Sequence, residues 1–203
     1  MSTIALPSSR PVLADALVAR RGFAVDTALV VAGALVVALC AQVEIPLPLV
    51  PITGQTLGVI LVGAALGSRR GAAAMAAYLV AGLAGLPVFA GFSGSLAAIA
   101  LPSFGFILGF IPAAFVTGWF AEGHWDRTPV RALIGFVLAS AIPFLVGVPY
   151  MALIMGTVLH LPVDLPTVLA AGLWPFVPGG LVKAALAAVL IPLAWRMVRR
   201  IEN

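Results

Sequence analysis

Pro175-Phe-Val-Pro-Gly-Gly-Leu-Val-Lys183 contains the only lysine in this 203-residue sequence, and a long apolar run follows it. Pro178, Gly179 and Gly180 predict a break in the chain, after which residues 181–195 form a helix of membrane length. Lys183 then lies within the first two turns of that helix. An ionisable side chain inside a membrane span is costly and usually marks a functional site. A lysine near a helix end can also reach out to the membrane surface, so both interpretations remain open.

The composition around this stretch is that of a membrane protein. Hydrophobic residues make up 63% of the sequence and charged residues 9%, whereas soluble domains contain about 25% charged residues. We therefore expect an all-α integral membrane protein. Residues 1–23 are polar and are predicted to form a cytoplasmic surface segment. Residues 24–203 are predicted to form a single transmembrane domain that binds a substrate.

Six apolar segments predict six transmembrane helices. The second and third segments are only marginally long enough to cross a bilayer, and Pro143 and Pro149 predict a kink or an end within the fifth. A helical turn or re-entrant piece is expected at 96–101, and a short interfacial helix at 167–173. The six segments are residues 24–43, 57–66, 72–83, 104–120, 132–159 and 181–195.

The arginines predict the orientation of these helices. All ten lie in the N-terminal segment, in the connections after the second and fourth helices, or at the C-terminus. Positively charged residues favour the cytoplasmic side, so both termini are predicted to be cytoplasmic. The remaining connections then meet Lys183 on the outer side. The arginines are Arg10, Arg20, Arg21, Arg69, Arg70, Arg127, Arg131, Arg196, Arg199 and Arg200.

The outer connections contain the candidate binding residues. Prolines at 46, 48 and 51 stiffen an apolar connection that is a poor solvent loop and a good lid over a site. Thr53 could serve only to cap the next helix, but Gln55 adds both a donor and an acceptor and favours a binding site. Glycines within 85–94, among them Gly91, suit close approach of the backbone to a ligand. The remaining candidates are Ser93, Ser103, Tyr150 and Trp174, with Phe89 and Phe92 as apolar walls.

An ammonium group near a helix N-terminus forms a natural site for an anion, because the free amides and the helix dipole add to its charge. The predicted ligand is therefore a small, mostly apolar carboxylic acid with an amide-like group at its other end. Lys183 is the residue expected to meet the carboxylate.

Small residues form two stripes on the first predicted helix and permit another helix to pack closely. One stripe is Ala24, Ala28 and Ala32, and the other is Ala34 and Ala38. Packing within the protein is the default interpretation. The more specific alternative is that a helix of a partner protein docks on these stripes.

Motifs for catalysis or energy coupling are absent from the sequence. It lacks the phosphate-binding pattern G-x4-G-K-[ST], the H-E-x-x-H pattern and paired carboxylates. Cys40 is the only cysteine, and His124 has no partner at metal-ligand spacing. The scattered arginines do not form a nucleic-acid-binding patch. We therefore expect no enzymatic activity, cofactor, metal or nucleic acid, and we expect separate subunits to drive any uphill transport.

Four motifs, in order along the chain, resemble the BioY family, whose members are biotin-capturing S-components of energy-coupling factor (ECF) transporters. The resemblance extends from about residue 25 to the C-terminus. It implies the six-helix S-component fold in the bacterial cytoplasmic membrane, with biotin bound near the outer face under the loop joining the first two helices. It also implies that the small-residue stripes contact a transmembrane coupling subunit, which works with ATPase subunits. The motifs are Pro48-Leu-Val-Pro-Ile-Thr-Gly-Gln-Thr-Leu57, Gly85-Leu-Pro-Val-Phe-Ala-Gly91, Gly147-Val-Pro-Tyr150 and Pro178-Gly-Gly-Leu-Val-Lys183.

Two positions depart from the family pattern. The family usually has Pro-Gly-Asp-x-x-Lys, and this chain has Gly180 in the acidic position, which adds Gly180 to the candidate site. The family usually has Thr-Gly-Gly-Tyr where this chain has Ser103-Phe-Gly-Phe106. A related acid, dethiobiotin or lipoate, is therefore a second candidate substrate. The alternative from another functional class is a membrane assembly or interaction protein whose small residues serve packing only.

Overall fold

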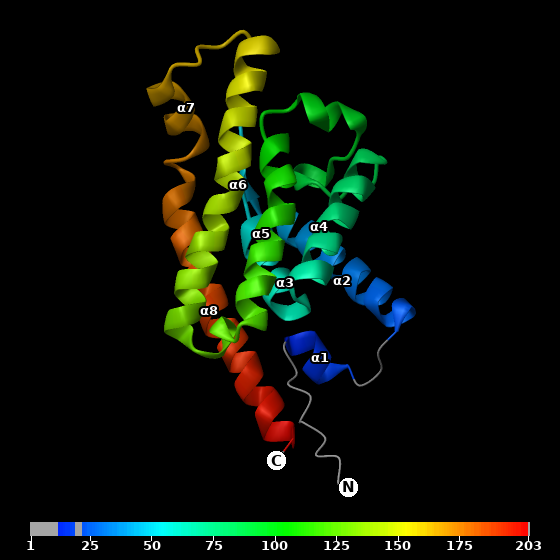
Figure 1. Ribbon diagram of the computed structural model, residues 1–203. Coiled ribbons are helices and arrows are strands. Elements are labelled where there is room, and N and C mark those ends of the chain that lie inside the picture. The colour runs from blue at the N-terminus through cyan, green and yellow to red at the C-terminus, as the bar shows by residue number, and fades with distance from the viewer. Residues whose placement is uncertain (1–11, 19–21, 203) are drawn as a thin grey trace, which may run out of the picture.

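The computed structural model describes residues 12–18 and 22–202, and it is a bundle of helices with short connections (Figure 1). Arg10, Arg20 and Arg21 lie outside the described residues. One antiparallel pair of two-residue strands, β1 and β2, interrupts the helical succession. The elements are α1 Leu13–Leu17, α2 Phe23–Ala41, β1 Glu44–Ile45, β2 Ile52–Thr53, α3 Gln55–Leu66, α4 Ser68–Leu83, η1 Ala90–Phe92, η2 Leu96–Ala100, α5 Phe104–Glu122, η3 Trp125–Arg127, α6 Pro129–Thr157, α7 Leu165–Gly172 and α8 Phe176–Glu202.

Each of the six predicted apolar segments falls on a helix, namely α2, α3, α4, α5, α6 or α8. Among the described residues, four helical segments are long and apolar enough to cross a membrane: α2, α5, α6 and the stretch Leu165–Val198. α3 is apolar but has only 12 residues. The predicted class, a helical protein with membrane-length apolar segments, is therefore confirmed.

The predicted break at residues 178–180 is wrong. α8 begins at Phe176 and continues through Pro178, Gly179 and Gly180. Proline is tolerated in a first helical turn, because the N–H that it lacks would have no acceptor within the helix. Lys183 consequently lies about two turns into α8. α6 is likewise a single helix that contains Pro143 and Pro149.

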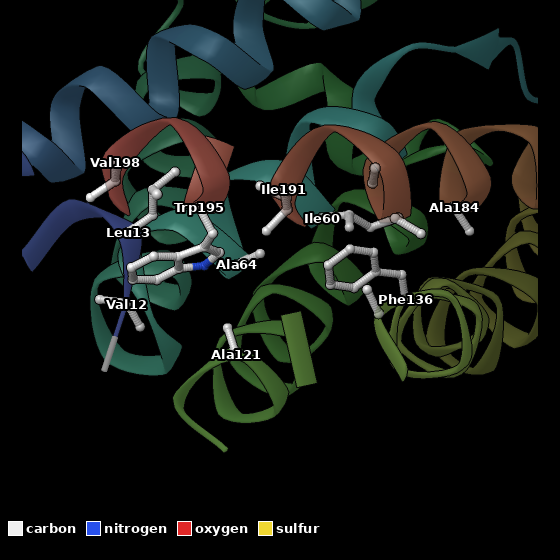
Figure 2. Packing of buried hydrophobic residues seen from close by; sticks show 13 residues of the cluster. Val12, Leu13, Ile60, Ala64, Ala121, Phe136, Ala184, Ile191, Trp195 and Val198 are labelled. Atoms are coloured by element: carbon white, nitrogen blue, oxygen red, sulfur yellow. The ribbon is translucent and has the colours of Figure 1, made fainter. Parts of the chain in front are cut away.

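The described part of the N-terminal segment is not a surface segment. Val12 and Leu13 are buried against Trp195 of α8, in a cluster that includes Ile60 and Phe136 (Figure 2). These side chains are apolar, and burying them removes their surface from water. α1 thus closes one end of the bundle, opposite α7 (Figure 1).

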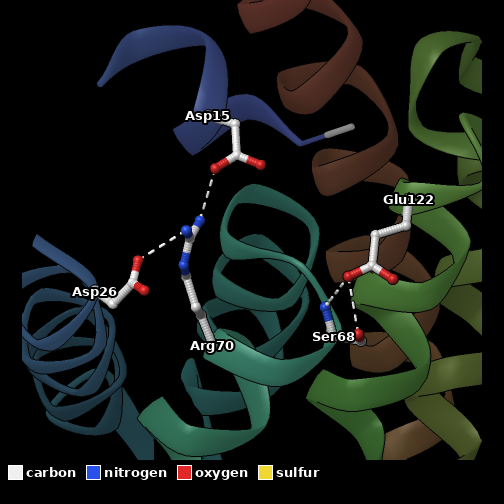
Figure 3. A network of polar contacts seen from close by, with 5 residues as sticks. All are labelled: Asp15, Asp26, Ser68, Arg70 and Glu122. Atoms are coloured by element: carbon white, nitrogen blue, oxygen red, sulfur yellow. Dashed lines mark hydrogen bonds and ion pairs between the residues drawn. The ribbon is translucent and has the colours of Figure 1, made fainter. Parts of the chain in front are cut away.

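Two sets of polar contacts join the helices at this end of the bundle. Arg70 of α4 lies between Asp15 of α1 and Asp26 of α2, at 2.8 Å and 2.7 Å (Figure 3). Glu122 of α5 accepts hydrogen bonds from the backbone N–H and the hydroxyl of Ser68. The end that carries these side chains is therefore joined through four helices.

A buried carboxyl joins α8 to the connection between α5 and α6. Asp126 in η3 is fully buried and accepts a hydrogen bond of 2.5 Å from Trp195 Nε1. Arg127 places its guanidinium carbon 3.4 Å from the centre of the Trp195 ring. Burial raises the pKa of the Asp126 carboxyl, and the Trp195 N–H and the Arg127 charge offset this only in part.

Glycines set the close contact between α5 and α6. A Cβ on Gly109 would lie 2.7 Å from Pro143 Cα, and a Cβ on Gly147 would overlap the Phe106 ring. Each glycine therefore leaves room for a residue of the facing helix, and α5 and α6 pack closely. α2, in contrast, buries only Gly33, Val37 and Ala41 among its residues.

Candidate functional site

A cavity of about 400 Å³ lies under the loop that joins α2 to α3. Small-molecule pockets span about 300–1,000 Å³ and are mostly apolar with a few polar groups, which is the character of this cavity. Its walls come from the α2–α3 loop, the α4–α5 connection, α5, α6 and the first turns of α8. Its polar lining residues are Glu44, Thr53, Gln55, Thr56, Ser93, Ser103, Ser140 and Lys183.

Lys183 provides the one ammonium group of the cavity, since the chain has no other lysine. Its Nζ donates to the backbone oxygen of Thr53 at 2.6 Å and to Thr56 Oγ1 at 3.1 Å. An ammonium group has three donors, so one remains for a ligand. Within the part of the chain that the structure describes, Lys183 forms no ion pair. Its positive charge is therefore available to an anion.

The loop over the cavity follows from its prolines. Pro46, Pro48 and Pro51 exclude a helix, and the loop instead forms the β1–β2 pair, in which Glu44 faces Thr53. This pairing turns the carbonyl of Thr53 to the lysine. The loop is thus a stiff cover whose end is fastened to α8.

Gln55 begins α3 and is held on both sides of its amide. Its Oε1 accepts from Thr53 Oγ1 at 2.7 Å, and its Nε2 donates to the Tyr78 hydroxyl at 2.6 Å. Tyr78 is fully buried in α4 and was not among the predicted site residues. The only sequence signal for it is that 78 is the one polar position in the apolar run 72–83.

Aromatic side chains form the apolar walls. Phe106 of α5 packs edge-to-face on Phe144 of α6 at 5.7 Å and stacks against Phe176 of α8 at 6.1 Å. Phe89 from the α4–α5 connection closes another side, packed edge-to-face on Tyr78 at 5.4 Å. Such walls suit the apolar body of a ligand.

The structure brings together five of the eight predicted binding residues. Lys183, Thr53, Gln55, Ser93 and Gly180 line the cavity. Gly180 is open, with no atom within 4 Å of a Cβ placed there.

The other three lie outside the cavity lining. Tyr150 packs on Phe104 and donates its hydroxyl proton to the backbone oxygen of Ile99 at 2.5 Å. Trp174 is 61% exposed. Gly91 has a φ of +64° and shapes the loop beside Glu44, a conformation that favours glycine.

The two small-residue stripes on α2 have different surroundings. Ala24, Ala28 and Ala32 are exposed. Ala34 and Ala38 are partly buried and pack against the core cluster that contains Val37. Internal packing therefore accounts for the second stripe only, and the first is a free surface of close-packing residues.

Known proteins with similar sequences belong to one family. The model of the BioY family matches residues 12–200. A biotin transporter BioY from Rhodobacter capsulatus is 42% identical over 164 residues, which cover 77% of this chain and 85% of that protein. A biotin transporter BioY from Rhizobium etli is 39% identical, covering 70% and 75% of the two chains. A putative biotin transporter BioYB from Bacillus subtilis is 37% identical, covering 76% and 75%.

One solved structure is also similar to this chain. It is the crystal structure of the S-component for biotin from an ECF-type ABC transporter, with a TM-score of 0.66 and 24% sequence identity. The match covers 84% of this chain and 90% of the other. The two proteins share a fold.

Proposed function

This chain belongs to the BioY family of membrane transport proteins, and from that membership and its cavity we propose that it captures biotin as the substrate-binding subunit of an ECF-type transporter. The observation that carries the proposal is the ammonium group of Lys183, which forms no ion pair among the described residues and lines a mostly apolar cavity. Biotin is a mostly apolar acid with a carboxylate at one end and a cyclic urea at the other. Its carboxylate would take the free donor of Lys183, and its ring system would lie among the aromatic walls.

The polar lining supports the opposite end of such a ligand. Ser103, directly before α5, and Ser140 of α6 line the cavity from elements other than the loop that binds Lys183. Hydroxyl groups donate and accept, as a cyclic urea requires. Gly180 leaves open space beside Lys183, so dethiobiotin or lipoate is a second candidate ligand for the same site.

The membrane arrangement that we propose has six crossings, α2 to α6 and α8, in one domain from residue 24 onward, with both termini cytoplasmic. The arginine distribution and the apolar helices support it. The membrane would be the bacterial cytoplasmic membrane. The exposed stripe of Ala24, Ala28 and Ala32 would meet a transmembrane coupling subunit, and ATPase subunits would supply the energy.

The test is a binding isotherm on the detergent-purified full chain. We expect saturable biotin binding that dethiobiotin and lipoate reduce only at higher concentration. Preferential binding of one of these two acids would reassign the substrate. Absence of binding of all three at micromolar concentration would overturn the proposal.

A further inference from the structure

Gln42, the residue that follows α2, ties the end of that helix to the α4–α5 connection. Its Nε2 donates to the backbone oxygens of Ala38 at 2.9 Å and Phe89 at 3.1 Å. Its Oε1 accepts from the backbone N–H of Phe92 at 2.9 Å. A backbone carbonyl only accepts and a backbone N–H only donates, so these partners fix the orientation of the amide.

The connection that Gln42 holds forms a wall of the cavity. Phe89 lines the cavity and is 4% exposed. Its ring occupies the notch left by Gly82, where any Cβ would overlap it. Three residues on, Phe92 has a φ of +53°, a left-handed conformation that is strained for a bulky side chain. The hydrogen bond from Phe92 N–H to Gln42 therefore stabilises a backbone conformation that the sequence alone disfavours.

The residues next to Gln42 also fasten the second cover of the cavity, the β1–β2 loop. Gly54 donates its N–H to the backbone oxygen of Val43 at 2.8 Å. A Cβ at Gly54 would lie 2.6 Å from the backbone oxygen of Cys40, so only glycine fits there. The neighbouring Thr53 supplies the carbonyl that holds Lys183. Residues 40–43 are thus attached to both segments that cover the cavity.

We propose that Gln42 is a positioning residue, and that residues 40–43 at the C-terminal end of α2 are the common attachment of both covers, so that loosening them speeds the exchange of ligand with the cavity. Gln42 holds the α4–α5 connection and Val43 holds the start of α3, so a displacement of this end of α2 would reach both covers at once. The identity of the ligand rests on the proposed function, but the attachment itself does not.

The first measurement needs no ligand. In a Cys40→Ala background, Ala98→Cys places a single thiol at a buried position of the cavity wall in the α4–α5 connection. Thr128→Cys places one at the exposed start of α6, outside the cavity lining. Gln42→Met keeps the side-chain length and removes the donor and acceptor. We expect it to speed thiol labelling at 98 about tenfold, the effect of one to two neutral hydrogen bonds, and to leave labelling at 128 unchanged. Equal labelling at 98 with and without Gln42 would overturn the proposal.

The second measurement is the rate of biotin dissociation from the otherwise native chain. We expect Gln42→Met to raise it about tenfold, whereas Thr27→Val, which removes a hydroxyl bonded only within α2, should leave it unchanged. An unchanged dissociation rate in Gln42→Met would overturn the link to ligand exchange. Faster labelling at 98 in a chain that never binds biotin would instead support the attachment and refute the proposed function.

Discussion

Replacing Lys183 by Met separates the two roles that the structure gives to its ammonium group. The group donates to the carbonyl of Thr53 and to the hydroxyl of Thr56, and its third donor faces no partner among the described residues. The substitution therefore removes the attachment of the covering loop and the charge that would meet a carboxylate. Met keeps the length of an apolar stem, so the packing of α8 should survive.

The two losses differ for acidic and neutral ligands. Loss of the loop attachment lowers the affinity for every ligand by a similar factor. Loss of the charge lowers the affinity only for an acid, and a charge-assisted hydrogen bond contributes about 1.5–3 kcal/mol. With tenfold in affinity for each ~1.4 kcal/mol, biotin should lose about ten- to a hundredfold more affinity than biotin amide.

Calorimetric titration of both ligands into wild type and Lys183→Met gives this difference directly. Thr56→Val is the matched control, because it removes one attachment of the loop and keeps the charge. It should weaken biotin and its amide equally. If Lys183→Met also weakened both ligands by one common factor, the lysine would only hold the loop, and the site for the carboxylate would have to be sought elsewhere in the cavity.

Three further predictions concern the support of the site and the stability of the fold. Tyr78→Phe removes the acceptor for Gln55 Nε2, and we expect calorimetry to show biotin affinity about two- to tenfold lower, the effect of one neutral hydrogen bond. Gly180→Ala meets no atom and should keep or raise the melting temperature, whereas Gly109→Ala meets the backbone of α6 and should lower it. Asp126 has a pKa raised by burial, so its contribution to stability is full below the unfolded pKa and is lost as pH rises through the folded one; Asp126→Asn should remove that decline from the melting temperature measured against pH.

The sequence reveals those features that depend on local chemistry. Apolar runs of membrane length predict helices because no other structure satisfies the backbone inside a bilayer. The prolines at 46, 48 and 51 predict a stiff loop, because they forbid a helix. The lone lysine indicates a functional site, because placing a charge inside an apolar segment costs free energy. From these signals Lys183, Thr53 and Gln55 were predicted to belong to one site, and all three line the cavity.

Features that depend on packing between distant segments were not predicted. Phe106 and Phe144 are ordinary apolar residues in the sequence, and they become cavity walls only because glycines bring α5 and α6 together. Tyr150 carries a polar group at the expected place but turns it to the α4–α5 connection. The start of α8 was misplaced because Pro178 was interpreted as a break, although a proline in the first helical turn is compatible with the helix.

The attachment of Lys183 explains how a charge is tolerated in a mostly apolar cavity. The Thr53 carbonyl and the Thr56 hydroxyl replace part of the water that the ammonium group has lost. Both acceptors belong to the segment that covers the cavity and leads into α3, so the lysine holds its own cover in place. A bound carboxylate would take the remaining donor and add a countercharge, which strengthens the whole cluster without breaking either bond. Ligand binding and closure of the loop would then support each other, and Val43, just after α2, fastens the end of the same loop through Gly54.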